Sequence, residues 1–199
     1  MTLRERVRPY MSEKRYQHTL GVERCVRKLA SIYLPEEEES LAAAALLHDI
    51  SKELPYEEHL RLIREMGIEL SDAQLRSPDI LHAISAATVI RRDFAEWAED
   101  RILRAISYHT VGNRNMTLFD KLLLVSDYIE EGRTYASCVA VREELFSRLV
   151  TAEDRSMLLD RTLLSILDHT IVFLVRHGLF IFEESLLLRN SILSSLSQS

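Results

Sequence analysis

Four histidines and two aspartates are spread along the first two thirds of the chain, each within a stretch of apolar residues. The apolar residues recur at steps of three and four, which places each of these polar side chains on the buried face of a helix. One isolated imidazole in such a position is more often a hydrogen-bonded core residue than a ligand. The joint pattern, from five different helices, is what indicates chemistry. The six residues are His18, His48, Asp49, His82, His109 and Asp127.

Bound cations would make this set of side chains tolerable in an apolar interior. Burying an unpaired carboxylate is costly, so two carboxylates with four imidazoles need a common compensating charge. Imidazole and carboxylate donors without thiolate suit iron, manganese, zinc or cobalt rather than calcium. Six donors exceed what one catalytic ion with open positions requires, so we expect two divalent ions. Neighbouring helical residues diverge, so His48 can bind one ion while the Asp49 carboxylate reaches the second.

Capping signals delimit the first two helices of this set. Apolar side chains at helical spacing predict a long helix over residues 12–34, with His18 on its buried stripe. A proline followed by four glutamates indicates the start of the next helix, and we interpret these glutamates as a cap. The second helix is apolar nearly all round, so we expect it in the middle of a bundle, running through His48 and Asp49 to about residue 54.

Two further helices are expected to carry the remaining histidines. The sequence Ser-Pro-Asp at 77–79 supplies an N-cap, a first-turn proline and an acid for the helix with His82. The helix that carries His109 is expected to end at Gly112, where glycine can adopt the left-handed conformation. Both histidines should therefore point inward.

The last candidate lies on a helix with a clear start. Thr117, with Asp120 three residues later, is typical of a capping box, and the apolar helix that follows carries Asp127 and ends at Gly132. The rest of the chain predicts a short helix, a long helix that ends at Gly178, and a terminal amphipathic helix. We see no chemistry in these C-terminal helices.

Composition and charge narrow the class of protein. Apolar residues make up 47% and charged residues 28%, with 5 Gly and 4 Pro, which favours an all-α fold. The net charge of −6 argues against nonspecific binding of nucleic acid. No apolar run approaches the roughly eighteen residues that a membrane span needs, and we expect no membrane association and a cytoplasmic location. Cys25 and Cys138 are far apart in apolar contexts, and we interpret both as buried thiols.

The other histidines and several acids have ordinary explanations. Structural or surface roles are assigned to three histidines, His59, His169 and His177. Helix caps or solvated side chains explain three acids, Asp120, Glu130 and Glu131.

The order H…HD…D, with two more histidines before the last aspartate, resembles the HD-domain phosphohydrolases. Within that superfamily the chain is similar to the YqeK family of bacterial hydrolases, which split diadenosine tetraphosphate symmetrically into two ADP molecules. The resemblance implies one HD-domain helical bundle over 1–199, with a metal-binding core at about 12–133 and C-terminal helices at about 139–196. The motifs that carry it are RYQHTLGV, ALLHDISK, AISYHTVGNRNMTLFDKLLLVSDYIEEGR and, more weakly, HTIVFLVRHG and LLLRN.

The family resemblance also implies a ligand set, which coincides with the set derived from the residues. One ion would be bound by His18, His48, Asp49 and Asp127, and the other by Asp49, His82 and His109. The resemblance implies iron as the metal, and the donor types leave manganese, zinc or cobalt open.

Further positions are expected to meet the nucleotide. Lys52 and Arg133 correspond to family positions that face substrate phosphates, and together with Asp49 they form the implied catalytic set. Thr110 and Gly112 lie beside the fourth histidine, where a phosphate could also be bound. Where the family usually has glycines after the third histidine (HGxxGA), this chain has HAISAA, and the extra methyl groups should narrow substrate access. The segment after Gly178 also lacks the family's usual histidine-proline.

The expected reaction is attack of a metal-activated water on an inner phosphate of a dinucleoside polyphosphate, with ADP as the leaving group. Two alternatives stay open at this point. The first is an HD hydrolase of another nucleotide, and the second is a nucleotide- or iron-sensing module without turnover. A homodimer through the apolar C-terminal helices is compatible with the sequence.

Overall fold

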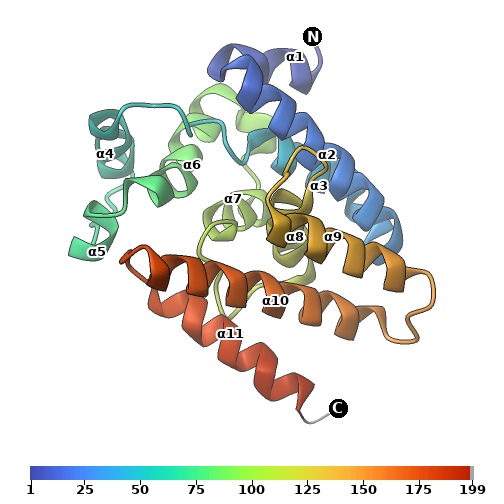
Figure 1. Ribbon diagram of the computed structural model, residues 1–199. Helices are drawn as coiled ribbons and strands as arrows, with labels where there is room; N and C mark the ends of the chain where they lie inside the picture. The colour runs from blue at the N-terminus through green and yellow to red at the C-terminus, as the bar shows by residue number, and fades with distance from the viewer. Residues whose placement is uncertain (198–199) are drawn as a thin grey trace.

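The computed structural model describes residues 1–197 and contains only helices and turns in that part of the chain (Figure 1). The last two residues of the predicted domain, 198–199, lie outside the described part. The all-α prediction is confirmed. The α-helices are α1 (Leu3–Val7), α2 (Glu13–Tyr33), α3 (Glu38–Leu47), α4 (Tyr56–Glu65), α5 (Asp72–Leu75), α6 (Leu81–Asp93), α7 (Asp100–Tyr108), α8 (Leu118–Ile129), α9 (Ala136–Leu149), α10 (Arg155–Arg176) and α11 (Glu183–Leu196).

Helix α3 forms the middle of the bundle, as its all-round apolar sequence predicts. Every residue from Leu41 to Leu47 is buried, and the helix packs against α1, α2, α7 and α8. Its four consecutive alanines let these neighbours approach closely. The predicted capping box of α8 is present, formed by Thr117 with Asp120, and the Ser12 side chain caps α2. The predicted N-cap at Ser77 is wrong, because this side chain makes no capping hydrogen bond and a 3-10 turn over Pro78–Ile80 precedes α6.

The predicted end of the central helix is wrong by about seven residues. Helix α3 stops at Leu47, and tight turns with backbone bonds three residues apart follow as far as Leu54. The cause is a side-chain anchor: Ser51 Oγ donates to the carbonyl of His82 at 3.0 Å, which draws this segment toward α6. Asp49 therefore lies in the first of these turns rather than on a regular helix.

The C-terminal helices pack beneath the part of the chain that carries the histidines. Helices α10 and α11 lie side by side at the bottom of Figure 1, and α10 also contacts α8 and α9. Ser185 Oγ at the start of α11 donates to the carbonyl of Val111 at 2.6 Å, which ties this pair to the turn after α7. No helix in residues 1–197 is long and apolar enough to cross a membrane.

Gly112 ends the segment after α7, as predicted, and its conformation is left-handed with a φ of 74°. A Cβ added there would lie 2.6 Å from Cδ2 of Leu188, a side chain that is 2% exposed. Gly67, with a φ of 69°, has the same backbone conformation but nothing within 4 Å of an added Cβ. These two glycines therefore separate backbone strain from steric overlap.

We predict that Gly67→Ala lowers the free energy of unfolding by about 1 kcal/mol, from backbone strain alone. Gly112→Ala should lower it by about 1–3 kcal/mol more, because the buried Leu188 has to move. Urea denaturation followed by circular dichroism measures both values on one scale. Equal losses in the two variants would contradict the packing of α11 on this turn.

Candidate metal centre

Three of the six predicted side chains form a first group that could hold a metal ion. His18 comes from α2, His48 from the C-cap of α3 and Asp127 from α8. Their ligand atoms lie within 4.8 Å of one another. Nε2 of His18 is 3.0 Å from Asp127 Oδ1, and Nε2 of His48 is 3.8 Å from the same oxygen.

A second group adjoins the first and shares His48 with it. His48, Asp49 and His109 have ligand atoms within 4.8 Å of one another. His82 joins this group through its Nε2, which lies 3.1 Å from Asp49 Oδ1 and 3.1 Å from Nε2 of His109. Asp49 is central, because its other oxygen lies 3.8 Å from Nε2 of His18. The structure thus brings all six predicted side chains together, and their role as ligands stays a prediction.

Hydrogen bonds at the outer nitrogens orient the imidazoles toward the centre. Nδ1 of His48 donates to the carbonyl of Ala45 at 2.7 Å, and Nδ1 of His109 donates to the carbonyl of Ile106 at 2.6 Å. In a neutral ring this leaves Nε2 with a free lone pair. Nε2 of His18 and Nε2 of His48 are buried beside carboxylate oxygens, but neither makes a well-aligned hydrogen bond. A cation between these atoms would satisfy them, so the donor set fits a metal ion.

Glu130, which the sequence analysis interpreted as a cap or a solvated acid, is buried and contacts the centre. It is 3% exposed, and its Oε1 lies 3.1 Å from Nδ1 of His18. Its Oε2 accepts the backbone N–H of Gly132 at 2.6 Å. A Cβ at Gly21 would lie 2.2 Å from Oε2, so the glycine on α2 leaves room for this carboxylate. Glu130 therefore orients His18 as a carboxylate partner, whereas His48 and His109 have carbonyl partners.

Two arginines pair with the buried carboxylates. Nη1 of Arg15 lies 2.6 Å from Asp49 Oδ2, and Nη2 of Arg133 lies 2.7 Å from Asp127 Oδ1. Arg133 also donates through Nε to the carbonyl of Asp127 at 3.0 Å. Sequence reasoning missed Arg15, although it lies three residues before His18 on the same helix. Arg133 thus contacts a predicted ligand directly, and its contact with substrate stays a prediction.

The mutual contacts perturb the protonation of the whole cluster. Burial opposes ionisation of Asp127, but Arg133 and His18 hold its pKa well below its usual range. Burial likewise opposes ionisation of Asp49, and His48 and His82 hold its pKa well below its usual range.

The histidines at the two ends of the cluster are perturbed in opposite directions. Burial alone would lower the pKa of His18, but the carboxylates of Asp127 and Glu130 raise it to about 9. Burial, with a contribution from neighbouring imidazoles, lowers the pKa of His109 to about 3. The imidazole of His18, beside two carboxylates, therefore carries a second proton at neutral pH, whereas the imidazole of His109 is neutral.

Of the predicted nucleotide contacts, Lys52 and Thr110 lie near the cluster. Nζ of Lys52 is 3.2 Å from Nδ1 of His82 and donates to the carbonyl of Asp79 at 3.0 Å. The hydroxyl of Thr110 is buried without a hydrogen-bond partner. Gly112 is buried instead against Leu188, so packing explains this glycine and its contact with nucleotide stays a prediction.

The remaining polar residues largely agree with the sequence analysis. His59 is buried with Nδ1 2.8 Å from the hydroxyl of Ser85, a structural role. His169 and Glu131 are exposed, and so is His177, whose Nδ1 donates to the carbonyl of Phe173. Both cysteines are buried and free, as predicted.

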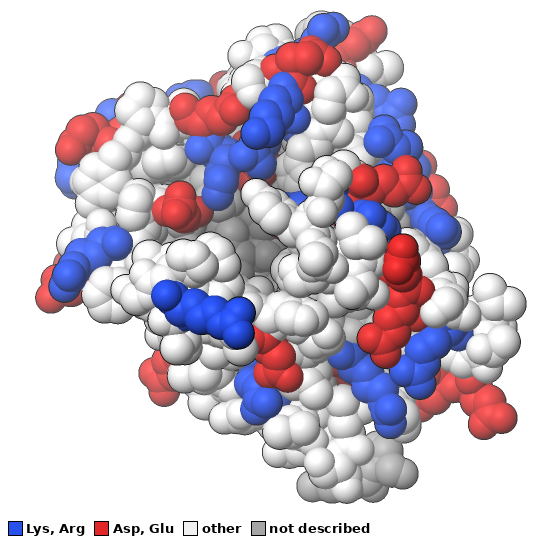
Figure 2. Space-filling model, in the orientation of Figure 1, with Lys and Arg blue, Asp and Glu red and all other residues white. Residues whose placement is uncertain are grey.

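Two cavities flank the cluster. The larger, of about 650 Å³, lies between α2 and residues 130–135 and includes His18 and Arg133 in its wall. The smaller, of about 160 Å³, includes Lys52 and His82. Figure 2 shows that the face turned toward the viewer is hollowed near its middle, with Lys or Arg side chains above and below the hollow.

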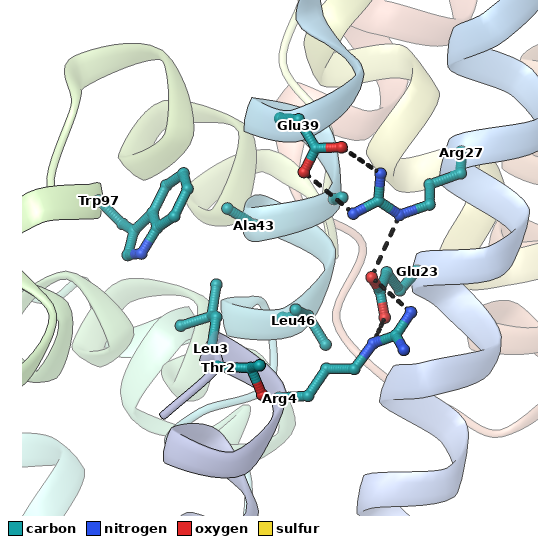
Figure 3. A pocket seen from close by; sticks show the side chains of 10 residues that line it. Thr2, Leu3, Arg4, Glu23, Arg27, Glu39, Ala43, Leu46 and Trp97 are labelled. Atoms are coloured by element: carbon teal, nitrogen blue, oxygen red, sulfur yellow. Dashed lines mark hydrogen bonds and ion pairs between the residues drawn. The ribbon is translucent and has the colours of Figure 1, made fainter.

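A separate cavity of about 440 Å³ lies where α1 meets α2 and α3 (Figure 3). Its charges are already balanced, because Glu23 pairs with Arg4 and Arg27, and Arg27 pairs with Glu39. None of the six clustered side chains is in its wall. It is therefore a poor candidate for the reaction site.

Comparison with known proteins identifies the family of the chain and several relatives. Residues 15–132 match the HD domain family. The chain is 32% identical to a protein of Halalkalibacterium halodurans named bis(5'-nucleosyl)-tetraphosphatase, symmetrical, over 94% of this chain and 93% of that one. A Bacillus subtilis protein of the same name is 32% identical, over 94% of each chain.

A solved structure shares the fold. The crystal structure of a predicted HD superfamily hydrolase involved in NAD metabolism, from Clostridium acetobutylicum, matches with a TM-score of 0.84 and 32% sequence identity. The match covers 97% of this chain and 96% of that one. The resemblance predicted from the sequence motifs is confirmed by these comparisons.

We predict that Glu130→Gln weakens metal binding by about 10- to 100-fold. His18 and the N–H of Gly132 use different oxygens of Glu130, so a glutamine would turn its NH2 group toward one of these two donors and the anchor of the imidazole would weaken. Isothermal titration of the metal-free protein with zinc measures the affinity. Glu131→Gln is the matched control, because the neighbouring Glu131 is exposed. Equal zinc affinity in the Glu130→Gln and Glu131→Gln variants would refute the orienting role of Glu130.

Metal binding should compete with a proton on His18. Because the pKa of His18 is raised to about 9, its ring is protonated at pH 7 in the metal-free protein and has to lose that proton to act as a ligand. The apparent zinc affinity should therefore rise about tenfold per pH unit between pH 7 and 8. Competition with a chromophoric chelator measures this slope, and an affinity independent of pH would contradict the assigned protonation.

Proposed function

Because the chain belongs to the HD domain family, we propose that it is a metal-dependent hydrolase that cleaves diadenosine tetraphosphate symmetrically into two ADP molecules. Relatives named symmetrical bis(5'-nucleosyl)-tetraphosphatases support this substrate, since they match the chain over more than nine tenths of its length. The observation that carries the proposal is the paired arrangement of ligand groups around Asp49, which suits two neighbouring cations.

The residues fit a dinuclear centre with imidazole and carboxylate ligands. His18, His48 and Asp127 would hold one ion, and Asp49, His82 and His109 the other, with Asp49 between them. We propose iron, and the donor set suits manganese, zinc or cobalt as well. When bound there, the ions supply Lewis acidity and a water of lowered pKa for attack on an inner phosphate.

The chain itself supplies basic groups on both sides of the cluster. Arg133 contacts Asp127 and forms part of the wall of the larger cavity, next to His18. Lys52 forms part of the wall of the smaller cavity, next to His82. A polyphosphate chain that extends over the cluster from one cavity to the other would meet the side chains of both Arg133 and Lys52. These two positive charges can balance the negative charge that develops on the phosphate during hydrolysis.

Two further properties belong to the same proposal. The free, buried thiols of Cys25 and Cys138 suit a reducing compartment, so we place the protein in the cytoplasm. We also propose a homodimer, supported by exposed apolar side chains near the end of α10 and in the turn after it. These include Phe173, Val175 and Leu179, which are 53%, 62% and 50% exposed.

Product analysis tests the proposed reaction. Metal-loaded protein incubated with diadenosine tetraphosphate should release ADP as its nucleotide product, as measured by anion-exchange chromatography. Asp127→Asn should lower both bound metal and turnover by about 100-fold or more, because it removes a charged ligand. Asp100→Asn, at an exposed position on α7, is the matched control and should change neither value.

The alternative outcomes are distinct. Release of AMP and ATP would overturn symmetrical cleavage but leave a metal-dependent hydrolase. Hydrolysis of a different nucleotide in a substrate panel would overturn the assigned substrate. Full metal loading without turnover of any nucleotide would overturn the enzyme proposal and favour a sensing module.

A further inference from the structure

The larger cavity beside His18 has features that the cluster alone does not explain. We call it the α2 groove, since α2 forms one wall and residues 130–135 form the other. Its volume of about 650 Å³ lies within the range of sites for small organic ligands, roughly 300–1,000 Å³. The cavity beside Lys52, at about 160 Å³, falls below that range.

Polar side chains of α2 line one side of this groove. Lys14, His18 and Arg24 all belong to its wall. With a rise of 1.5 Å per residue, Lys14 and Arg24 are about 15 Å apart along the helix axis. His18 lies between Lys14 and Arg24 on α2, so the groove passes next to a candidate metal ligand.

The charge of the groove is opposite to that of the whole protein. Four basic and two acidic side chains form its walls, whereas the chain has a net charge of −6. Within the groove, Arg15 and Arg133 already pair with Asp49 and Asp127. Lys14 and Arg24 are exposed and have no ion pair within residues 1–197. These two cations are free to bind an anion.

The rim of the groove carries a free aromatic ring. Tyr135, at the N-cap of α9, is 72% exposed although it is part of the wall of this cavity. No aromatic or cation–π partner of Tyr135 occurs in residues 1–197. Exposed tyrosines next to a cationic groove can stack on nucleobases, and each such contact contributes about 1–3 kcal/mol to binding.

We propose that the α2 groove binds one nucleoside diphosphate arm of the substrate, with its base stacked on Tyr135 and its phosphates attracted by Lys14 and Arg24, which flank His18 on α2. This assignment rests on the proposed function, in which the phosphate that is attacked lies at the cluster of histidines and aspartates. It adds the place where one nucleoside half is held. The cavity at Arg4 and Arg27 has no free cation to offer a phosphate.

Binding of two probes to the metal-loaded protein tests the two halves of this site separately. ADP carries both a base and phosphates, whereas pyrophosphate carries phosphates alone. Tyr135→Ala should raise the Kd for ADP about tenfold and leave the Kd for pyrophosphate unchanged. Arg24→Gln should raise both values about tenfold. Isothermal titration calorimetry measures all four affinities.

Two control variants make these changes interpretable. Tyr135→Phe keeps the aromatic ring and should bind ADP as wild type does. Arg64→Gln removes an exposed arginine on α4, away from the groove, and should change neither affinity. An unchanged Kd for ADP in both Tyr135→Ala and Arg24→Gln would overturn the proposal.

The test is separate from that of the reaction. If wild type releases ADP from diadenosine tetraphosphate but the groove variants bind ADP normally, the groove assignment is wrong and the reaction stands. If the groove variants lose ADP affinity while wild type hydrolyses no dinucleoside polyphosphate, the nucleotide site stands and the proposed reaction is wrong.

Discussion

The cost of burying the carboxylates of Asp49 and Asp127 among apolar helices is the constraint on which the rest of the structure depends. Neither group can stay ionised in this interior without nearby positive charge and hydrogen-bond donors. Arg15 and Arg133 provide part of that charge. The imidazoles supply further contacts at 3.0–3.8 Å. Nε2 of His18 and Nε2 of His48 are buried beside these carboxylates without a well-aligned hydrogen bond, so a cation between them would fit the donor set.

The packing of the bundle turns this constraint into a centre with a defined shape. Because α3 ends at Leu47 and Ser51 is anchored to α6, the Asp49 carboxylate lies between the imidazole of His18 on α2 and those of His82 and His109, from α6 and the end of α7. A longer helix, as expected from the sequence, would continue past this point without that anchor. His18, which is part of the wall of the α2 groove, remains 13% exposed, and the side chain of Asp127 remains 17% exposed.

Much of this arrangement could be predicted from the sequence, because apolar spacing shows which polar residues face inward. The grouping of the six residues follows from that logic, and Thr117 with Asp120 three residues later predicted the start of α8. Glu130 could not be recognised in the same way, since two consecutive glutamates after a helix are usually solvated. Its burial depends on the space left by Gly21, and a glycine on the buried face of a long helix was the available signal.

We propose that the six clustered side chains would hold two cations, and anomalous diffraction from crystals of the metal-loaded protein at the absorption edge of the metal tests this most directly. We expect two anomalous peaks, one at ligand distance from His18, His48 and Asp127, and the other at ligand distance from Asp49, His82 and His109. Peaks elsewhere, or the same six side chains without any peak among them, would contradict it.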